Sequence, residues 1–383
     1  MPDIDQRFWK GRRVLVTGHT GFKGTWLTAW LDQMGAQVTG FSAAPPTQPS
    51  LFEASDLATR IDHVEGDVAD LLAVEEVLAR SRPEVVLHLA GQSILARGHA
   101  EPVETFRTNV MGTVSVLEAI RKVGSVRAAV LVTSDKCYLD QHKTCGEDDP
   151  LGGLEAYGAS KACAEIAVQA YRSSFFPGSF TCGIASARAG NVFGAGDFAA
   201  NRLVPDLARA FLRNIPPRLR SPDAIRPWQH VLDAVGGYLL LAEMLYERPE
   251  AYSTAWNFGP EAGSEWTVGE IADVLARAFG MQGWESAPAL PVREEAILRL
   301  HTARARRLLS WKPQLTMTEA LHWTAQGYKR LDRTGDTSWL GEQIELYRGR
   351  LQLRHLSGQT RDEPIELPIL HTRTSGGGNH VAA

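Results

Sequence analysis

Tyr157 and Lys161 have the types and spacing of a proton-transfer pair. They lie four residues apart, so on a helix both side chains project from one face. A lysine ammonium close to a phenol favours the phenolate, which is a base able to take a proton from a hydroxyl group of a bound molecule. Considered alone, the same spacing also fits an ordinary surface pair, so the interpretation depends on what the fold places nearby.

A hydroxyl, a carboxyl and an amine follow one another in Ser134-Asp135-Lys136, directly after the apolar run Ala-Val-Leu-Val-Thr. Ligands of open α/β sheets bind at the carboxyl ends of the strands. We therefore expect these three side chains to share one site with Tyr157 and Lys161. For Lys136, an ion pair with Asp135 is the alternative role, and the residues alone leave both open.

Three glycines at three-residue spacing, Gly18, Gly21 and Gly24, separate an apolar run from a helical pattern. Gly18 allows a tight turn, Gly21 lets the backbone approach a pyrophosphate, and Gly24 lets the helix pack on the strand. The helix N-terminus adds free N–H groups and the positive end of its dipole. In this context the spacing predicts a dinucleotide-binding loop; the alternative is a glycine-rich turn that binds nothing.

The ribose end of the dinucleotide has no obvious partner in the sequence. After the second expected strand, where a ribose-binding acid would stand, the chain reads Gly-Phe-Ser-Ala-Ala-Pro at 40–45. This position therefore does not separate NAD from NADP. Asp67 lies at the end of the third expected strand and could lie beside the adenine or cap the next helix, and the two readings have equal weight.

Short apolar runs alternate with amphipathic stretches through the first half of the chain, which is typical of a parallel sheet wrapped by helices. Strands are expected at 14–16, 37–41, 63–68, 85–90, 128–133 and 183–187. Helices are expected at 26–34, 71–78, 103–120, 159–171, 268–279 and 317–331, with a further one ending before Pro83. The pattern predicts an α/β fold: a Rossmann-type, doubly wound parallel sheet with a smaller C-terminal α/β substrate lobe.

The domain organisation follows from a change of rhythm near residue 195, where prolines begin to punctuate shorter elements. We assign residues 1–195, with returning segments near 225–260, to the dinucleotide-binding domain. Residues 196–355 are assigned mainly to the second lobe. Residues 356–383 are polar and unpatterned, and we expect them to form a disordered tail.

The composition excludes several classes of protein. The 383 residues are 44% hydrophobic and 22% charged, with a net charge of −4, which gives no electrostatic footprint for nucleic acid or an anionic membrane. The chain contains four cysteines, which lack the spacing of a zinc site, and no metal is expected. No run approaches the roughly 18 apolar residues of a membrane span, and the N-terminus is polar, so we expect a cytoplasmic protein without a membrane partner.

These motifs together resemble the extended short-chain dehydrogenase/reductases that act on nucleotide sugars, and within them the CDP-glucose 4,6-dehydratase group. The resemblance runs over about residues 8–330, and its strings are 17–24, 108–113, 133–138, 188–192, 225–231 and 256–260. Most nucleotide-sugar dehydratases carry Asp-Glu where this chain has Asp135-Lys136. The lysine is characteristic of the CDP-glucose group and is the most specific signal.

The resemblance implies a mechanism. Tyr157, supported by Lys161 and Ser134, would take the proton of the sugar C4 hydroxyl while hydride passes to the cofactor. Lys136, in its neutral form, would then remove the C5 proton while Asp135 protonates the departing C6 oxygen. Return of the hydride to C6 would leave a 4-keto-6-deoxy sugar without net redox change.

The resemblance also implies binding residues and a partner. The expected cofactor is NAD, with NADP not excluded, held by Gly18, Thr20, Gly21, Phe22, Lys23, Gly24, Asp67, Val68, Leu89, Ala90, Gln92, Asn109, Tyr157 and Lys161. The expected substrate contacts are Asn191, Arg202, Arg226, His230 and Arg293. For His230 a place in the core is at least as good a reading, and for Arg293 the alternative is a surface arginine.

The resemblance also implies a homodimer, formed by pairing the helices around 101–122 and 158–175. The apolar stripe of Val110, Val114, Leu117 and Ile120 permits this arrangement but fits packing within one chain equally well.

Three segments depart from the family pattern: 91–99, 139–149 and the stretch near residue 300. They put the identity of the substrate in more doubt than the type of reaction. One alternative function is a nucleotide-sugar 4-epimerase, which needs Tyr157 and Lys161 but not the Asp135-Lys136 pair. The other is a cofactor-binding regulator without enzymatic activity, which would not need the intact set of reactive side chains.

Overall fold

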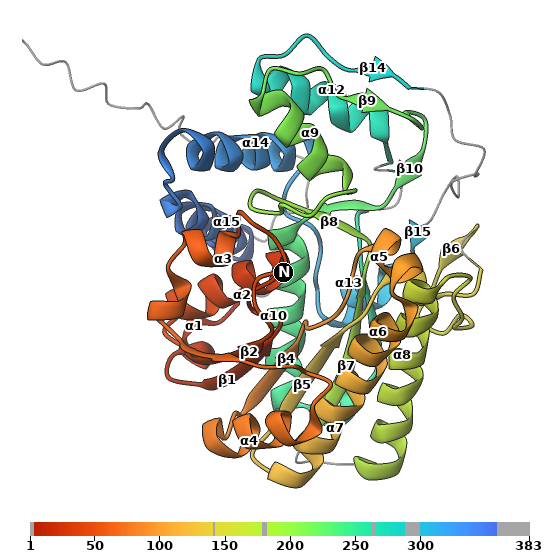
Figure 1. The fold of residues 1–383 in the computed structure, drawn as a ribbon. Coiled ribbons are helices and arrows are strands. Elements are labelled where there is room, and N and C mark those ends of the chain that lie inside the picture. Colours follow the sequence, from red (N-terminus) through yellow and green to blue (C-terminus); the bar gives the residue numbers. More distant parts are fainter. Residues whose placement is uncertain are drawn as a thin grey trace, which may run out of the picture.

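Seven parallel strands form one central sheet in the order β12-β7-β5-β4-β1-β2-β3 (Figure 1). The strands are β1 (Arg13–Thr17), β2 (Gln37–Ser42), β3 (Asp62–Glu65), β4 (Val85–His88), β5 (Ala128–Val132), β7 (Gly183–Ala189) and β12 (Ala255–Phe258). The computed structural model describes residues 4–140, 142–177, 182–261, 263, 265–287 and 299–357, with side chains to residue 353. The predicted Rossmann-type, doubly wound sheet is confirmed.

The central strands are apolar because both faces of the sheet are covered. Every residue of β4 and β5 is buried, which explains why these segments read as continuous apolar runs rather than alternating ones. Along β1, Val14 and Val16 pack into one core while Leu15 packs into the other. This alternation joins the two helical layers through the sheet.

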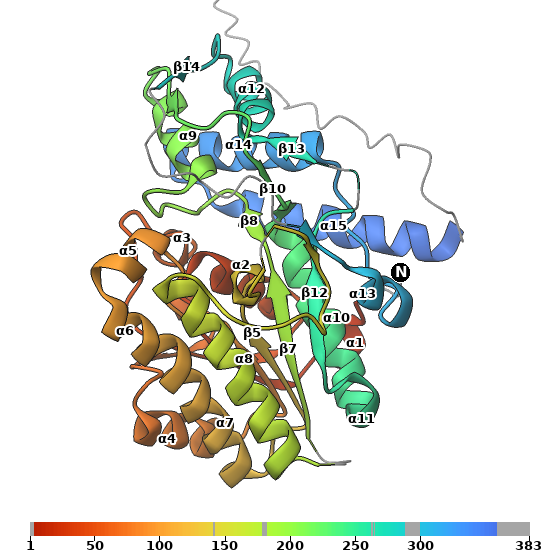
Figure 2. The ribbon, with the colours of Figure 1, turned by 90° about the vertical axis from the view of Figure 1, so that its right-hand side faces the viewer.

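The helices cover the two faces in separate layers (Figure 2). One face carries α2 (Phe22–Gln33) and α10 (Val231–Glu247). The other carries α4 (Leu71–Ser81), α7 (Gly112–Val123) and α8 (Ala156–Phe175). Both α10 and β12 come from beyond residue 225, so the chain returns to the sheet after entering the second lobe.

The second lobe lies beyond the carboxyl ends of the strands, at the top of Figure 1. Its helices are α9 (Leu203–Leu212), α12 (Val268–Phe279) and α14 (Met317–Thr334). Small two-stranded sheets join β9 (Arg218–Leu219) to β14 (Glu285–Ser286) and β10 (Ile225–Arg226) to β13 (Trp266–Thr267). The capping box between Thr267 and Glu270 is present, and α12 has the predicted bounds.

Several helical segments differ from the sequence-based expectation. Helices α9 and α10 were not predicted, and the helices expected at 71–78 and before Pro83 form the single helix α4. The helix expected at 103–120 is divided into α6 (Pro102–Phe106), a π-helical turn over Arg107–Met111 and α7. A helix that we did not predict, α15 (Ser338–Ser357), packs on α2 of the sheet domain although its residues were assigned to the second lobe. Its contacts are aromatic, with Trp339 against Trp26 and Tyr347 against Trp30.

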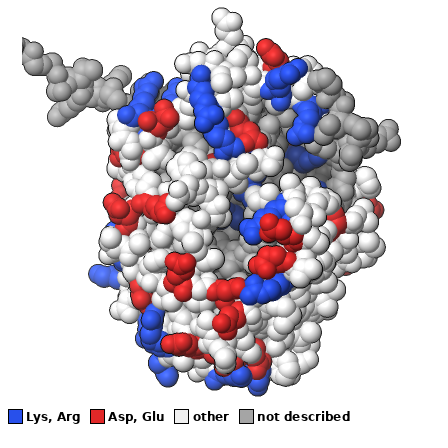
Figure 3. Space-filling model, viewed as in Figure 1, with Lys and Arg blue, Asp and Glu red and all other residues white. Residues whose placement is uncertain are grey.

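The surface carries both signs of charge. Figure 3 shows Lys and Arg interspersed with Asp and Glu, without a large region of one sign. Within the described ranges, no helix is long and apolar enough to cross a membrane. In the same ranges, no group of three or more His, Cys, Asp or Glu side chains could hold a metal ion. The tail expected at 356–383 lies outside the described residues from residue 358 onward.

Candidate active site

The glycine loop between β1 and α2 is folded too tightly for side chains. Gly18 has a φ of 74°, and a Cβ there would lie 2.5 Å from the backbone nitrogen of Ala90. A Cβ on Gly24 would lie 2.0 Å from the carbonyl oxygen of Gly18. The loop therefore presses on the end of β4, where Leu89 donates from its backbone to the Thr17 carbonyl at 3.0 Å. Any larger residue at Gly18 or Gly24 would open this turn.

The first turn of α2 faces the same edge of the sheet. Gly21 precedes the helix without a side-chain cap, and the first-turn N–H groups of a helix, here those of Phe22 and Lys23, have no carbonyl partner within it. The Thr20 hydroxyl forms hydrogen bonds with the Ser42 hydroxyl at 2.8 Å and with the Ala43 carbonyl at 3.0 Å, at the end of β2. Free N–H groups at the positive end of a helix dipole fit a pyrophosphate.

Lys23 connects the glycine loop to the expected catalytic residues. The pKa of Lys23 is lowered to about 7, first by burial and then by the charges of Lys161 and Arg202, while Asp135 acts in the opposite direction. Residues from α2, β5, α8 and the second lobe thus share one electrostatic environment. The structure thus brings the glycine loop and the side chains expected to be reactive close to one another.

Tyr157 and Lys161 lie in the first two turns of α8. The helix begins at a fixed point because the Glu155 carboxylate accepts the backbone N–H groups of Tyr157 and Gly158, both at 2.6 Å. The Lys161 ammonium donates to the Val132 carbonyl at 3.4 Å. Burial lowers the pKa of Lys161 to about 8, against the raising effect of Glu165.

Ser134 joins the phenol to the carboxyl group. Its hydroxyl donates to Asp135 Oδ1 at 3.0 Å. The pKa of Tyr157 is raised to about 12, chiefly by burial, although a hydrogen bond with Ser134 acts in the opposite direction. Ser134 also caps a short 3₁₀ turn by accepting the backbone N–H of Lys136 at 3.2 Å. That turn places the Lys136 side chain, which is half-buried, next to Asp135.

Asp135 has the environment of an acid. It is 3% exposed, and burial raises the pKa of its carboxyl group. Among the described residues its Oδ2 atom has no hydrogen-bond partner. A buried carboxyl oxygen without a protein partner fits an oxygen of a bound ligand. This environment is compatible with the proton-donor role expected for Asp135.

Asn109 holds the loop after β4 to α8. Its side-chain Oδ1 accepts the Gln92 backbone N–H at 2.8 Å, and its Nδ2 donates to the Gln92 carbonyl at 3.0 Å and the Ser160 hydroxyl at 2.8 Å. The π-helical turn places this buried amide where it can reach both segments. A Cβ on Gly91 would lie 3.0 Å from Lys161 Nζ, so this loop adjoins the reactive residues.

The region expected to border the adenine contains Asp67 and Val68. Asp67 forms an ion pair with Arg107 and accepts the Ala69 backbone N–H at 2.9 Å. The alternative reading of Asp67 as a helix cap is wrong, because Asp70 caps α4 through the N–H groups of Leu72 and Ala73. Val68 is buried against Gly112.

The expected substrate residues Asn191, Arg202 and Arg226 come from three segments. Asn191 begins β8 (Asn191–Phe193), which pairs with β11 (Trp228–His230). Arg202 binds Asp197 at 2.8 Å and the Ser93 hydroxyl at 2.6 Å, so it spans from the second lobe to the 91–99 segment. Arg226 is half-buried on β10.

His230 lies in the core. It is 1% exposed and packs against the rings of Trp26 and Phe193. Its Nδ1 accepts the Leu232 backbone N–H at 3.3 Å, which caps α10. This is the core reading that the sequence left open. Arg293 lies outside the described residues.

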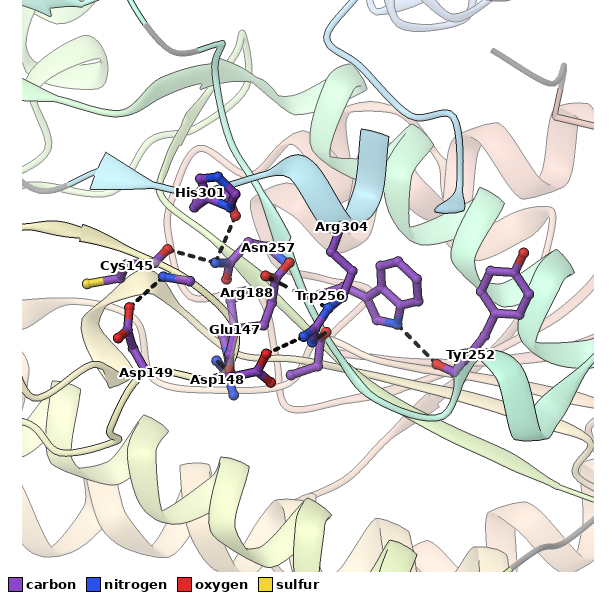
Figure 4. Close-up of polar contacts among 12 residues, drawn as sticks. Cys145, Glu147, Asp148, Asp149, Arg188, Tyr252, Trp256, Asn257, His301 and Arg304 are labelled. Carbon is purple, nitrogen blue, oxygen red and sulfur yellow. Dashed lines mark hydrogen bonds and ion pairs between the residues drawn. The ribbon is translucent and has the colours of Figure 1, made fainter. Parts of the chain in front are cut away.

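Sequence analysis missed a buried polar network beside the site, drawn in part in Figure 4. Glu165 and Arg188 form an ion pair of 2.7 Å at its centre. A signal was present, because Glu165 lies four residues after Lys161 and continues the face of α8 that carries Tyr157.

Comparison with known proteins adds to this geometry. Residues 14–255 match the model of the NAD dependent epimerase/dehydratase family. The chain belongs to that family. It is 42% identical over 340 residues to the CDP-glucose 4,6-dehydratase of Salmonella typhimurium, covering 87% of this chain and 95% of the relative.

More distant family members include the epimerases. UDP-glucose 4-epimerase 3 of Oryza sativa subsp. japonica is 27% identical over 296 residues, covering 70% of this chain and 77% of the relative. Among solved structures, the NAD complex of dTDP-glucose 4,6-dehydratase from Bacillus anthracis has the same fold. Its TM-score is 0.70 at 20% identity, with 86% of this chain and 98% of that chain covered.

Proposed function

We propose that the protein is a CDP-glucose 4,6-dehydratase that uses NAD and releases CDP-4-keto-6-deoxyglucose and water. The observation that carries the proposal is the buried Asp135 carboxyl group, which shares the Ser134 hydroxyl with Tyr157. An epimerase needs the base but no proton donor for a departing oxygen. The 42% identical relative of that name, matched over nearly its full length, supports the same reading.

The cofactor would be held by the glycine loop and the first turn of α2. Both fit a dinucleotide: Gly18 and Gly24 have no space for side chains, and the first-turn N–H groups of Phe22 and Lys23 lack helical partners. When bound, NAD supplies hydride acceptance at the sugar C4 and hydride donation at C6. We assign the remaining cofactor contacts to Asp67, Leu89 and Ala90 at the ends of β3 and β4.

The first proton transfer is the work of Tyr157. Its phenolate takes the proton of the C4 hydroxyl as the carbonyl forms there. A hydrogen bond with the hydroxyl of Ser134 lowers the pKa of Tyr157 and so favours the phenolate. We assign the same effect to the ammonium of Lys161, which supplies positive charge one helical turn away. Burial opposes them by raising the pKa of Tyr157, so the support of both neighbours is required.

The second pair of proton transfers removes water. The C4 carbonyl acidifies the neighbouring C5–H bond, and Lys136 takes that proton. Asp135, whose pKa is raised by burial, gives its proton to the departing C6 oxygen. One proton leaves carbon and one joins oxygen, so the lost group is a neutral water molecule.

The diphosphate of the substrate needs positive charge, which the site supplies locally. Arg202 and Arg226 are planar donors suited to phosphate oxygens, and Asn191 offers a neutral amide at the start of β8. We assign the substrate diphosphate to these residues. Arg293 stays a prediction, and for His230 we propose no contact with substrate.

We also propose a homodimer formed through α6, α7 and α8. Exposed apolar side chains lie on α6, on the π-helical turn before α7 and on α8: Val103, Phe106, Met111, Ile166 and Phe175. Leu117 and Ile120 of the stripe noted in the sequence are buried within the chain instead. An apolar face on two adjacent helices fits a second copy of the same face around a two-fold axis.

We place the enzyme in the cytoplasm. None of the four cysteines forms a disulfide bond within the described residues, which fits a reducing compartment.

The test is incubation of the purified protein with CDP-glucose and, separately, with dTDP-, GDP- and UDP-sugars. Loss of one water from CDP-glucose alone, detected by mass, supports the proposal. Inversion of the sugar without water loss identifies an epimerase, and loss of water from another nucleotide sugar alone moves the assignment to that base. No reaction with any of them overturns the proposed function.

A further inference from the structure

The ion pair between Glu165 and Arg188 is buried directly behind the proposed base. Its two side chains are 3% and 4% exposed and lie 2.7 Å apart. Removing two charges from water costs free energy that their attraction often fails to recover. The pair therefore needs an explanation other than stability, and its hydrogen bonds provide one.

Glu165 fixes the helix that carries the base. It lies one turn beyond Lys161 and accepts hydrogen bonds from the hydroxyl groups of Thr133 and Ser186. Thr133 immediately precedes Ser134 in the chain. The Glu165 carboxylate thus fixes the position of α8 relative to the end of β5. This position determines how Tyr157 approaches Ser134.

Arg188 extends the connection to the loop beyond β5. One of its nitrogens donates to the Tyr138 hydroxyl at 2.8 Å and to the Glu147 carbonyl at 2.9 Å. Tyr138 lies two residues after Lys136, and Glu147 belongs to the 139–149 segment that departs from the family pattern. The same ion pair therefore holds both the base helix and this loop.

Asn257 carries the network to a second divergent segment (Figure 4). It accepts the Tyr138 hydroxyl at 2.7 Å and donates to the carbonyl groups of Cys145 at 3.1 Å and His301 at 3.3 Å. Strands β6 (Thr144–Cys145) and β15 (Arg299–Leu300) pair at the same place. The divergent segments near 145 and 300 are thus one unit attached to the buried pair.

We infer that Glu165 is a positioning residue for the Tyr157–Lys161 base, and that Arg188 couples it to the 139–149 loop through Tyr138. This inference rests on the proposed function. It adds to that function the residues that fix the position of the base and of the 139–149 loop. In this proposal, neither Glu165 nor Arg188 touches the reacting atoms. They link the base, the acid-bearing turn and the loop in one hydrogen-bonded set.

The charge of Glu165 affects the pKa of Lys161. Its negative neighbour Glu165 raises its pKa against the effect of burial, and so does Cys137. Lys23 from α2 and His88 from β4 are the other titratable groups that interact with it. Removal of the Glu165 charge would therefore let the Lys161 ammonium lose its proton at lower pH.

The main test is the Glu165→Gln variant, assayed for kcat across pH with CDP-glucose. We expect kcat to fall about tenfold and its alkaline limb to move down by about one pH unit. Glu165→Asp keeps the charge and is expected to keep the limb where the wild type has it. The matched control is Glu243→Gln, which removes another buried carboxylate. Glu243 lies on α10, away from the site, and accepts a hydrogen bond from the indole N–H of Trp9.

Two further variants keep the test decisive if Glu165→Gln does not fold because Arg188 is left unpaired. The double variant Glu165→Gln/Arg188→Gln removes both charges and is expected to show the same shift of the limb, since Arg188 is not among the groups that shift the pKa of Lys161. Tyr138→Phe loosens only the loop, and we expect it to raise KM about fivefold without moving the limb.

A uniform loss of kcat at every pH, equal to that of Glu243→Gln, would show that Glu165 is merely structural and would overturn the inference. An unchanged KM in Tyr138→Phe would overturn the coupling to the loop. Failure of the proposed function looks different, because the wild-type protein itself would then release no water from CDP-glucose.

Discussion

The Oδ2 atom of Asp135 lies 3.1 Å from the position that a Cβ on Gly190 would occupy. Pro227 lies closer still to that position, at 2.6 Å. The free oxygen of the proposed acid therefore faces space that only a glycine leaves open. A methyl group there would compress the site at the point where the departing oxygen needs a proton.

Gly190→Ala is accordingly expected to lower kcat for water loss by about ten- to a hundredfold, because the displaced carboxyl group no longer meets its target. The measurement is steady-state formation of the 4-keto product. Gly349→Ala, at a site where an added Cβ meets nothing within 4 Å, is the control and should be neutral. Wild-type activity in Gly190→Ala would contradict the assigned place of the acid.

Asp135→Asn separates the two halves of the reaction. The amide cannot supply the proton for the C6 oxygen, so water loss is expected to slow by about 10²- to 10³-fold. C4 oxidation still has its base, and reduced cofactor should accumulate, visible in its near-ultraviolet absorbance after mixing with CDP-glucose. If Asp135→Asn loses oxidation and dehydration together, the division of labour is wrong. Asp148→Asn, on an exposed carboxylate, is the matched control.

Tyr157→Phe removes the base itself. We expect the rate of C4 oxidation to fall by about 10³-fold or more while the protein stays folded, because only a hydroxyl group is lost. Stopped-flow absorbance of the cofactor measures this step. Tyr171→Phe changes a tyrosine on the same helix, bonded to Glu118 on the surface, and should leave the rate unchanged. Equal rates in the two variants would exclude Tyr157 as the base.

The pH dependence follows from Lys161. Its pKa is lowered to about 8, so the ammonium that favours the phenolate is present below that pH and lost above it. The value of kcat/KM is therefore expected to fall as the pH rises through about 8. In Lys161→Arg, whose guanidinium keeps its charge, the alkaline limb should move to higher pH. A profile that is identical in both proteins would contradict this role.

Ile166→Glu tests the proposed dimer. Ile166 is 55% exposed on α8, and a carboxylate there would be desolvated on both sides of a two-fold interface, so a folded monomer is expected. Sedimentation velocity gives the mass. Leu72→Glu, at a 76% exposed leucine on α4, should keep the mass of the wild type. A dimer that survives Ile166→Glu would place the interface elsewhere.

Much of the fold could be predicted because its signals are local. The apolar runs that became β1, β4 and β5 reflect burial on both faces, and the capping box at Thr267 fixed the start of α12 at the correct residue. Helix α15 was not predicted, although the sequence carries a signal for it. Its buried residues Leu340, Ile344, Tyr347 and Leu351 recur at helical spacing.

The site was less predictable where distant segments meet. The π-helical turn at Asn109 has no sequence signature, because it depends on hydrogen bonds to the loop after β4 and to α8. Likewise Arg188 stood in a motif, yet its partner Glu165 comes from another element and only the folded chain brings them together. Spacing identifies residues on one helix face, but it does not show what another strand places opposite.

The most direct test of the account uses CDP-glucose labelled with deuterium at C4. Tyr157, Lys136 and Asp135 in their assigned roles predict a product that is lighter by one water and carries the deuterium at C6, since the hydride leaves C4 and returns within one active-site cycle. Mass spectrometry and proton NMR of the product locate the label. Deuterium that stays at C4 with the sugar inverted, or a product that keeps all its oxygen, would contradict the dehydratase assignment.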